Sequence, residues 1–349
     1  MSSQLYIGND LSAVPSVVIE KIVPMPLSVQ YKKDASGKLL KPDNELDITG
    51  VTGITDIDSY ILQGKYSGSN IDHFDFNTLV RLSGIYACER AYQNCSKLTN
   101  IDLGSLTTIS GNYACYYMFS GCTGITSVNL GSLTTINGDG CCNRMFTNCN
   151  KITNLDLKSL TTINGTNTCA YMFQYCSGIT GHLDLSSLKT IGGYAPCEYM
   201  FQYCSGITSV DLSGLTSIGS SYILNDMFRD CVNLVSADLS SLTSVTGKSM
   251  ERLFQGCSKL TTVDLSSLST ISGDMACNYM FGNCTSLRTL SFPALKTIYT
   301  NQFGNMLSGC TDVTMHFPSN LEQKIQTMTG YPNFGGTETV LLYDLPATE

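Results

Sequence analysis

Residues 119–138 read Phe119-Ser-Gly-Cys122-Thr-Gly-Ile125-Thr-Ser-Val128-Asn-Leu130-Gly-Ser-Leu133-Thr-Thr-Ile136-Asn-Gly, and the same pattern recurs along most of the chain. Nine cysteines mark the recurrence, at positions 95, 122, 149, 176, 204, 231, 257, 284 and 310, in steps of 26 to 28 residues. Six more, at 88, 115, 142, 169, 197 and 277, each precede one of these by seven residues. Elsewhere Leu224, Met250 or Phe303 replaces the second cysteine, so that position requires only an apolar side chain. This period indicates a stack of similar coils.

Each part of the repeat predicts its own local structure. Val210-Asp-Leu212 alternates apolar and polar side chains, as a short half-buried strand does, and Leu215-Thr-Ser-Ile218 predicts a second extended segment on another side of the coil. Residues 114–122 space their apolar side chains by about three, four and seven, which predicts one or two helical turns packed inward. The predicted fold class is therefore a β-rich repeat solenoid.

The strand pattern can be followed from residue 46 to residue 315, in eleven coils of about 27 residues. We expect an N-terminal segment over 1–42, the solenoid over 43–317 and a C-terminal cap over 318–349. The first segment is interpreted as a small β cap or as a module that docks the rod to a larger assembly. In the last, Ser319 and Glu322 form a capping-box pattern that predicts a helix over 318–331, followed by a strand over 337–343.

The motif Phe-x-x-Cys-x-x-(Leu/Ile)-x-x-Val-x-Leu-x-x-Leu-x-x-Ile, as it stands from Phe119 to Ile136, resembles the BspA-type, or Treponema-type, leucine-rich repeat. The resemblance covers about residues 43–318. That family usually has proline and a longer turn after the strand, which only Pro293 and Pro318 keep here. The resemblance implies a right-handed curved solenoid that serves in adhesion and recognition, and it does not imply an enzyme.

The composition narrows the function classes. Of the 349 residues, only 14% are charged, so Ser, Thr, Asn, Gly and Tyr must cover much of the surface. The net charge of −8 argues against a nucleic-acid-binding protein, which needs a basic stripe. No apolar run approaches the ~20 residues of a membrane span, and residues 1–10 lack the pattern of a signal peptide. We expect no membrane insertion, and a virion or an extracellular surface as the place of action.

A column of polar residues follows the centres of the predicted strands. It consists of Asp47, Asp75, Asp102, Asn129, Asp156, Asp184, Asp211, Asp238, Asp264, Ser291 and His316. Carboxylates ~4.8 Å apart repel by roughly 1 kcal/mol in water, so something must offset the repulsion. Three explanations stay open: hydrogen bonds from backbone N–H groups as in an Asx turn, Ca²⁺ or sugar hydroxyls bound along the column, or a catalytic carboxylate cluster. Asp156, Asp184, Asp211 and Asp238 are candidate ligand-binding residues.

The cysteine columns also have alternative explanations. Buried free thiols that pack as small apolar side chains explain the interchange with Leu, Met and Phe. Disulfides between coils would need a torsion near ~90°, which stacked identical rotamers do not easily supply. Zinc would need Cys-x-x-Cys pairs or Cys/His clusters. We expect reduced thiols, which suit folding in a reducing compartment, and neither a metal nor a cofactor, with Ca²⁺ along the aspartate column as the open alternative.

A second column lies five residues before each of the nine cysteines. Its members are Arg90, Tyr117, Arg144, Tyr171, Tyr199, Asp226, Arg252, Tyr279 and Asn305, with Tyr116, Tyr175 and Tyr203 nearby. Tyr and Arg are favoured at recognition surfaces because they combine a large contact area with a polar group. The column is interpreted either as an outer cover of the Met-Phe segment or as a strip that contacts a ligand. The candidates are Tyr117, Arg144, Tyr171, Tyr199, Arg252 and Tyr279.

These features favour a non-enzymatic recognition or adhesion protein that binds a cell-surface glycan or protein. A phage tail or fibre component and a bacterial surface adhesin are two versions of this hypothesis. An intracellular or virion scaffold without an external ligand is one alternative, and a carbohydrate-active enzyme is another. Enzymatic function has little support, because His73, His182 and His316 are isolated and lie in no motif such as Gly-x-Ser-x-Gly.

Overall fold

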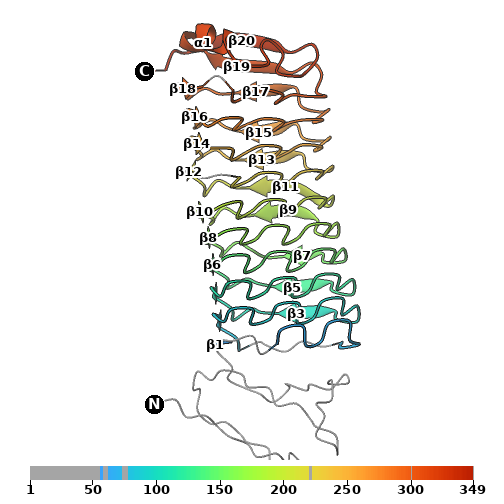
Figure 1. Ribbon diagram of the computed structural model, residues 1–349. Helices are drawn as coiled ribbons and strands as arrows, with labels where there is room; N and C mark the ends of the chain where they lie inside the picture. Colours follow the sequence, from blue (N-terminus) through green and yellow to red (C-terminus); the bar gives the residue numbers. More distant parts are fainter. Residues whose placement is uncertain (1–55, 58–61, 73–77, 220–221, 300, 349) are drawn as a thin grey trace, which may run out of the picture.

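The computed structural model describes residues 62–72, 78–219, 222–299 and 301–348, together with the backbone of residues 56–57. Over these ranges the chain forms a rod of stacked coils, whose C-terminal end carries the last strands and the helix (Figure 1). The proposed docking segment 1–42 and the first two predicted strands, near residues 46 and 74, lie outside the described residues.

Each regular coil contributes one strand to each of two parallel ladders. The main ladder contains β3 (Asn100–Asp102), β5 (Ser127–Asn129), β7 (Asn154–Leu155), β9 (Gly181–Asp184), β11 (Ile207–Asp211), β13 (Ser236–Asp238), β15 (Thr262–Asp264), β17 (Thr289–Ser291) and β19 (Thr314–Pro318). The second ladder contains β1 (Asp56–Ile57), β2 (Arg81–Leu82), β4 (Thr108–Ile109), β6 (Thr135–Asn137), β8 (Thr162–Asn164), β10 (Thr190–Gly192), β12 (Ser217–Ile218), β14 (Ser244–Thr246), β16 (Thr270–Ser272) and β18 (Thr297–Ile298). The predicted β-rich solenoid is confirmed, with about ten turns.

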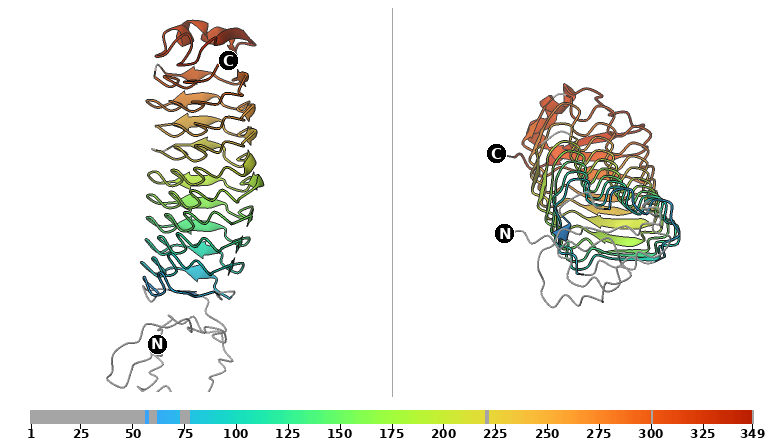
Figure 2. Two further views of the ribbon diagram at one scale, coloured as in Figure 1. Left: turned by 90° about the vertical axis from the view of Figure 1, so that its right-hand side faces the viewer. Right: turned by 60° about the horizontal axis from the view of Figure 1, so that its bottom comes forward.

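The two ladders lie on different sides of the rod. Figure 1 shows the main strands along the front and the second ladder along the left edge, and the tilted view of Figure 2 shows the coils lying one behind another. Equivalent residues pair across coils, as Val210 does with Ala237. Within the described chain, the main ladder is interrupted between β7 and β9 and between β15 and β17, and the second ladder between β10 and β12.

One aromatic ring from each regular coil lies at the centre of the rod. The stacked rings belong to Phe119, Phe146, Phe173, Phe201, Phe228, Phe254 and Phe281, which are fully buried. Their neighbouring centroids are 5.2 to 6.0 Å apart, and their planes differ by 3° to 16°. Aromatic pairs contribute stability beyond their buried area, so each added coil extends this phenylalanine ladder by one favourable contact.

All sixteen cysteines are buried and free, which confirms the prediction of reduced core thiols. The nine that mark the repeat also donate hydrogen bonds. Each Sγ lies 2.9 to 3.2 Å from a carbonyl oxygen of the preceding coil, as Cys176 does from Phe146. Burial raises the pKa of these nine thiols, to about 11 at Cys310, and that of Cys277 to about 12, so they stay protonated.

The third side of each coil, formed by residues 113–121 and their equivalents, is named here the turn face. The helical turns predicted for it are wrong, because the segment forms consecutive β-turns. The Ala114 N–H donates to Gly111 O in the same coil (3.1 Å), whereas the Cys115 N–H donates to Cys141 O in the next coil (2.6 Å). A helix would direct every donor to the carbonyl four residues earlier. Sending alternate donors to the neighbouring coil makes the turn face a third ladder.

The C-terminal cap has the predicted order of elements but a shorter helix. A 3₁₀ turn, η2 (Ser319–Leu321), leads into α1 (Glu322–Gln326), and β20 (Val340–Leu345) pairs in parallel with β19. The predicted capping box is wrong, because neither helix start has a side-chain cap hydrogen bond. Leu321, Ile325 and Met328 are buried and join the core of the rod, so this segment covers its last coil.

Candidate functional site

The turn face holds the tyrosine and arginine column in an unusual backbone conformation. Left-handed residues recur at intervals of four, as at Tyr113, Tyr117 and Gly121, whose φ values are 56°, 55° and 74°. All six candidates, Tyr117, Arg144, Tyr171, Tyr199, Arg252 and Tyr279, occupy the middle position, with φ between 53° and 58°. The third residue of a type II turn needs a positive φ, which glycine and asparagine adopt most readily. A bulky residue there costs about 1 kcal/mol.

Four of the six candidates form one continuous stack, which we name the tyrosine–arginine strip: Tyr117, Arg144, Tyr171 and Tyr199. The Arg144 guanidinium lies between two phenol rings, 5.5 Å from the centroid of Tyr117 and 4.1 Å from that of Tyr171. Tyr171 in turn stacks on Tyr199 at 4.8 Å with an interplanar angle of 13°. All four side chains are partly exposed. Cation–π contacts and stacking hold their polar groups in a row along the rod.

The strip ends at Tyr199, because the next member of the column is an acidic residue, Asp226. Asp226 is only 1% exposed, and its carboxylate pairs with Arg229 at 3.2 Å and with Arg252 at 3.4 Å. Arg252 therefore belongs to a largely buried ion-pair network, which also includes Glu251 at 3.0 Å. Tyr279 makes no ring stack or cation–π contact with the described residues. The structure thus separates these two candidates from the strip.

The ion-pair network adjoins a partly buried carboxyl group, that of Glu198. Burial and the nearby carboxylates of Asp226 and Glu251 raise the pKa of Glu198 to about 7, although Arg252 opposes the shift. Burial, followed by the charges of Asp226 and Glu198, also raises the pKa of Tyr199 to about 12. The phenol at this end of the strip is therefore a neutral hydrogen-bonding group at physiological pH.

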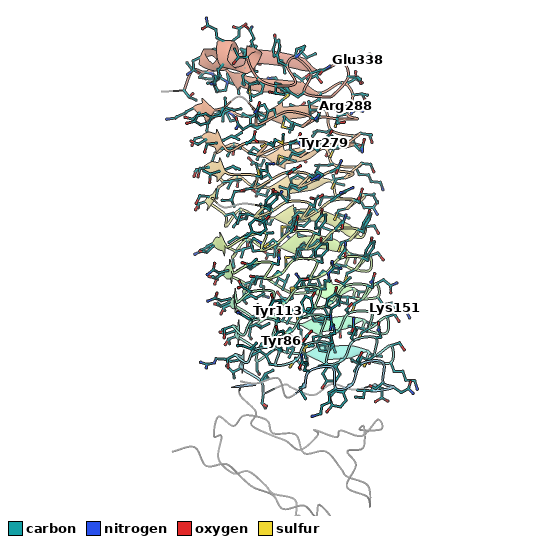
Figure 3. The ribbon with its side chains drawn as sticks, in the orientation of Figure 1. Tyr86, Tyr113, Lys151, Tyr279, Arg288 and Glu338 are labelled. Atoms are coloured by element: carbon teal, nitrogen blue, oxygen red, sulfur yellow. The ribbon has the colours of Figure 1, made fainter. Side chains whose placement is uncertain are left out.

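Further tyrosines flank the strip on the same face. Tyr86 stacks on Tyr113 at 5.2 Å, and Tyr175 stacks on Tyr203 at 4.7 Å. The sequence reasoning singled out Tyr175 and Tyr203 but missed Tyr86 and Tyr113, which lie four residues before the main column and could have been found by that spacing. Figure 3 labels Tyr86, Tyr113 and Tyr279, which come from different coils of this face. The result is a wide surface of phenol groups.

The aspartate column lies on the main strands, away from the strip. In Asp156, Asp184, Asp211 and Asp238, Oδ1 accepts a hydrogen bond from the backbone N–H two residues later, at 2.8 to 3.1 Å. The Asx-turn explanation is therefore confirmed as the structural role of these residues. Hydrogen bonds from Ser186 also lower the pKa of Asp184. A ligand role for the four aspartates stays a prediction, and Asp47 and Asp75 lie outside the described residues.

Two absences in the described part of the chain concern metals and membranes. No group of three or more His, Cys, Asp or Glu side chains gathers there in a way that could hold a metal ion. No helix in those ranges has the combination of length and apolar character that crossing a bilayer requires. Calcium along the aspartate column thus stays a prediction, which no cluster of ligands among the described residues supports.

Comparisons with known proteins concern the repeat. The model of the BspA type leucine rich repeat region matches residues 47–139, 88–221, 141–248 and 166–308. A leucine-rich repeat protein of T. pallidum is 21% identical, covers 62% of this chain and 75% of its own, and has a TM-score of 0.34. A leucine rich cell surface protein of Faecalibacterium prausnitzii is 14% identical, with 82% and 83% covered and a TM-score of 0.31.

A third solved structure is the pneumococcal vaccine antigen PcpA, which is 16% identical, with 90% of this chain and 70% of that chain covered and a TM-score of 0.30. No curated protein matches the chain. The family model spans well over half of the residues, and the coils it describes are the coils of the rod. The chain therefore belongs to the BspA-type leucine-rich repeat family.

Proposed function

We propose that this chain is a non-enzymatic recognition protein whose tyrosine–arginine strip binds a glycan or a protein at a cell surface. One observation carries the proposal: bulky tyrosines and an arginine occupy left-handed positions of the turn face. Neighbouring left-handed positions hold better-fitting residues in some coils, such as Asn148 and Gly121, and tyrosines in others, such as Tyr113 and Tyr175. Strain that persists at exposed side chains is typical of functional surfaces.

The chemistry of the strip supports a binding role. Stacking fixes the side chains before a partner arrives, so less rotamer entropy is lost on binding. Arg144 makes no ion pair with a carboxylate among the described residues, and its guanidinium can still donate hydrogen bonds outward. Tyr and Arg are also the residue types that dominate binding energy at protein interfaces.

Membership of the repeat family also supports a binding role. Proteins of this repeat class are generally binding proteins, and the similar structures include one described as a cell surface protein and one described as a vaccine antigen. These are bacterial proteins, and none of the descriptions names a phage component, so the phage version of the hypothesis gains no support. A docking role for residues 1–42 stays part of the proposal.

The left-handed backbone of the strip allows a test by substitution with asparagine. In the triple variant Tyr117→Asn, Arg144→Asn and Tyr171→Asn, asparagine fits the left-handed backbone but removes the contact area. Wild type and variant would be applied to an array of immobilised glycans and, by flow cytometry, to whole bacterial and host cells. We expect wild type to bind and the variant to bind at least about tenfold more weakly, a loss of ~1.4 kcal/mol.

Two controls make the result specific. The urea midpoint of the triple variant should be equal to or higher than that of wild type, because relief of strain offsets the lost stacking. Lys151→Asn changes an exposed residue outside the strip, labelled at the right-hand edge of Figure 3, and should leave binding unchanged. Undiminished binding by the triple variant would refute the strip as the contact surface. A wild type that binds no glycan and no cell would favour a structural spacer.

A further inference from the structure

The interruption between β7 and β9 has a local cause in the sequence. The step from Cys176 to Cys204 is 28 residues, and the additional residue is Gly181, at the start of β9. Its φ is +81°, and a Cβ built there would meet no atom within 4 Å. The Gly181 N–H donates to Gly206 O in the following coil at 3.1 Å. The insertion lies at an irregularity in the β9–β11 pairing, between Ile207 and Ser209, and β9 is unpaired with β7.

The interruption leaves a core side chain of the main-strand face partly exposed. Leu155 on β7 is partly exposed, although the equivalent Val128 and Leu183 are 4% and 2% exposed. The hydrogen bond that Leu103 and Leu185 donate to the next coil, at 3.0 and 2.9 Å, has no counterpart at Leu130 or Leu157 in the described structure. The coils are therefore less completely paired on both sides of β7, and Leu155 becomes partly accessible.

A cavity of about 300 Å³ occupies this place. Its polar walls come from three coils and include Asn129, Asn154, Asp156, Thr180 and His182, and its apolar lining includes Leu155. It lies on the main-strand face, so it is separate from the tyrosine–arginine strip on the turn face. Its volume lies at the lower end of the range for small-molecule sites.

The interruption also leaves polar side chains without partners. The Thr126 and Thr153 hydroxyls each donate to a carbonyl of the preceding coil at 3.2 Å. The equivalent Thr180 hydroxyl and the Asn154 amide make no side-chain hydrogen bond with any described residue. His182 uses Nδ1 toward Ser209 Oγ at 2.9 Å, which leaves Nε2 for another partner. Residues that carry an amide, a hydroxyl and an imidazole thus line the cavity.

The charge of the cavity points to a neutral ligand. Asp156 is its only acidic lining residue, and the second carboxylate oxygen lies 3.4 Å from Lys158 Nζ. The other polar side chains of the lining can both donate and accept hydrogen bonds. Leu155 adds a partly exposed apolar side chain to the lining. A ring that carries several hydroxyls on its rim and C–H groups on its face satisfies both features. We propose that the β7–β9 cavity binds one neutral sugar unit of a glycan.

Two substitutions and a deletion test the site. Saturation-transfer NMR would use the methyl glycosides of glucose, galactose, mannose and N-acetylglucosamine at millimolar concentration, with methyl sialoside as the acidic comparison. We expect at least one neutral glycoside to bind wild type. Asn154→Ala and Thr180→Val should each weaken that binding about five- to tenfold, because each removes hydrogen bonds to the ligand. Deletion of Gly181 should restore the 27-residue step, close the cavity and abolish binding.

The controls separate this site from the proposed strip. Thr261→Val removes an equivalent hydroxyl in a regular coil, where it donates to Val235 O at 3.2 Å, and should leave glycoside binding unchanged. The triple asparagine variant of the strip should also bind glycosides as wild type does. No binding of any neutral glycoside, preference for the sialoside, or binding that Asn154→Ala and Thr180→Val both leave intact would overturn the proposal. If the tyrosine–arginine strip bound no cells, that result would not contradict the proposed sugar site.

Discussion

The turn face and the main-strand face are built from the same repeat, but only the turn face is continuous. From Phe119 to Phe281, each core phenylalanine N–H donates to the next coil at 2.8 to 3.0 Å. The main-strand face is interrupted twice over the same stretch. The coil steps vary from 26 to 28 residues, and the extra residue Gly181 lies at the main strand, outside the turn face.

This difference indicates which face of the coil fixes the register between neighbouring coils. The turn face places its phenylalanine rings against one another and sends every second N–H to the next coil, so a shift there would break stacking and hydrogen bonds together. A short main strand loses only a few ladder bonds when one residue is inserted. The turn face therefore keeps the coils in register, and the main-strand face can acquire a local site.

The largest effect should come from breaking the phenylalanine ladder. Phe173→Ala would remove a fully buried ring that stacks on both neighbours, and we expect the free energy of unfolding to fall by about 3–5 kcal/mol. Leu155→Ala on the interrupted face should cost only ~1–2 kcal/mol, because Leu155 is already partly exposed. Urea denaturation followed by circular dichroism would measure both. Equal losses would contradict the view that the turn face holds the register.

A smaller effect should follow from loss of a thiol hydrogen bond. Cys176→Ala would remove the bond from Sγ to Phe146 O and leave a small cavity, and we expect a loss of about 1–2 kcal/mol. Cys141 lies outside both cysteine columns and donates to no carbonyl of the described residues, so Cys141→Ala is a control for a buried thiol without a carbonyl acceptor and should cost less. The same urea titrations would measure the two variants. If Cys141→Ala costs as much as Cys176→Ala, the thiols act only as small apolar side chains.

The smallest effect should be a pH dependence at the end of the strip. The pKa of Glu198 is raised to about 7 from an ordinary value of 4.5, so the folded chain favours its protonated form. Its contribution to stability is fully present below pH ~4.5 and is lost as pH rises to about 7. Because the group is only partly buried, we expect a change of order 1 kcal/mol.

Glu198→Gln should remove this part of the pH dependence. The measurement is the difference between urea midpoints at pH 5 and pH 8, compared for wild type, Glu198→Gln and the exposed control Glu322→Gln. The control should show the wild-type difference. An unchanged difference in Glu198→Gln would mean that Glu198 is already ionised at pH 5 and that the carboxylates beside it do not oppose its charge.

The site was only partly predictable. Tyr117, Arg144, Tyr171 and Tyr199 were identified because one column of the repeat varied among large polar residues, and the structure brings these four together. Arg252 shares the column but pairs with Asp226. Sequence position cannot reveal this, because the pairing depends on side chains that lie 26 residues apart and meet only through stacking.

The repeat, the apolar core and the expectation of free thiols follow from the order of the residues, because the period and the interchange of Cys with Leu, Met and Phe are visible in one dimension. Three other features depend on how the coils stack: residues 114–122 form turns and not helix, the aspartates cap their own turns, and a cavity lies beside β9. They could not be predicted because hydrogen-bond partners are chosen in three dimensions. A backbone donor can bond within its own coil or to the next one, and that choice exists only once the coils are stacked.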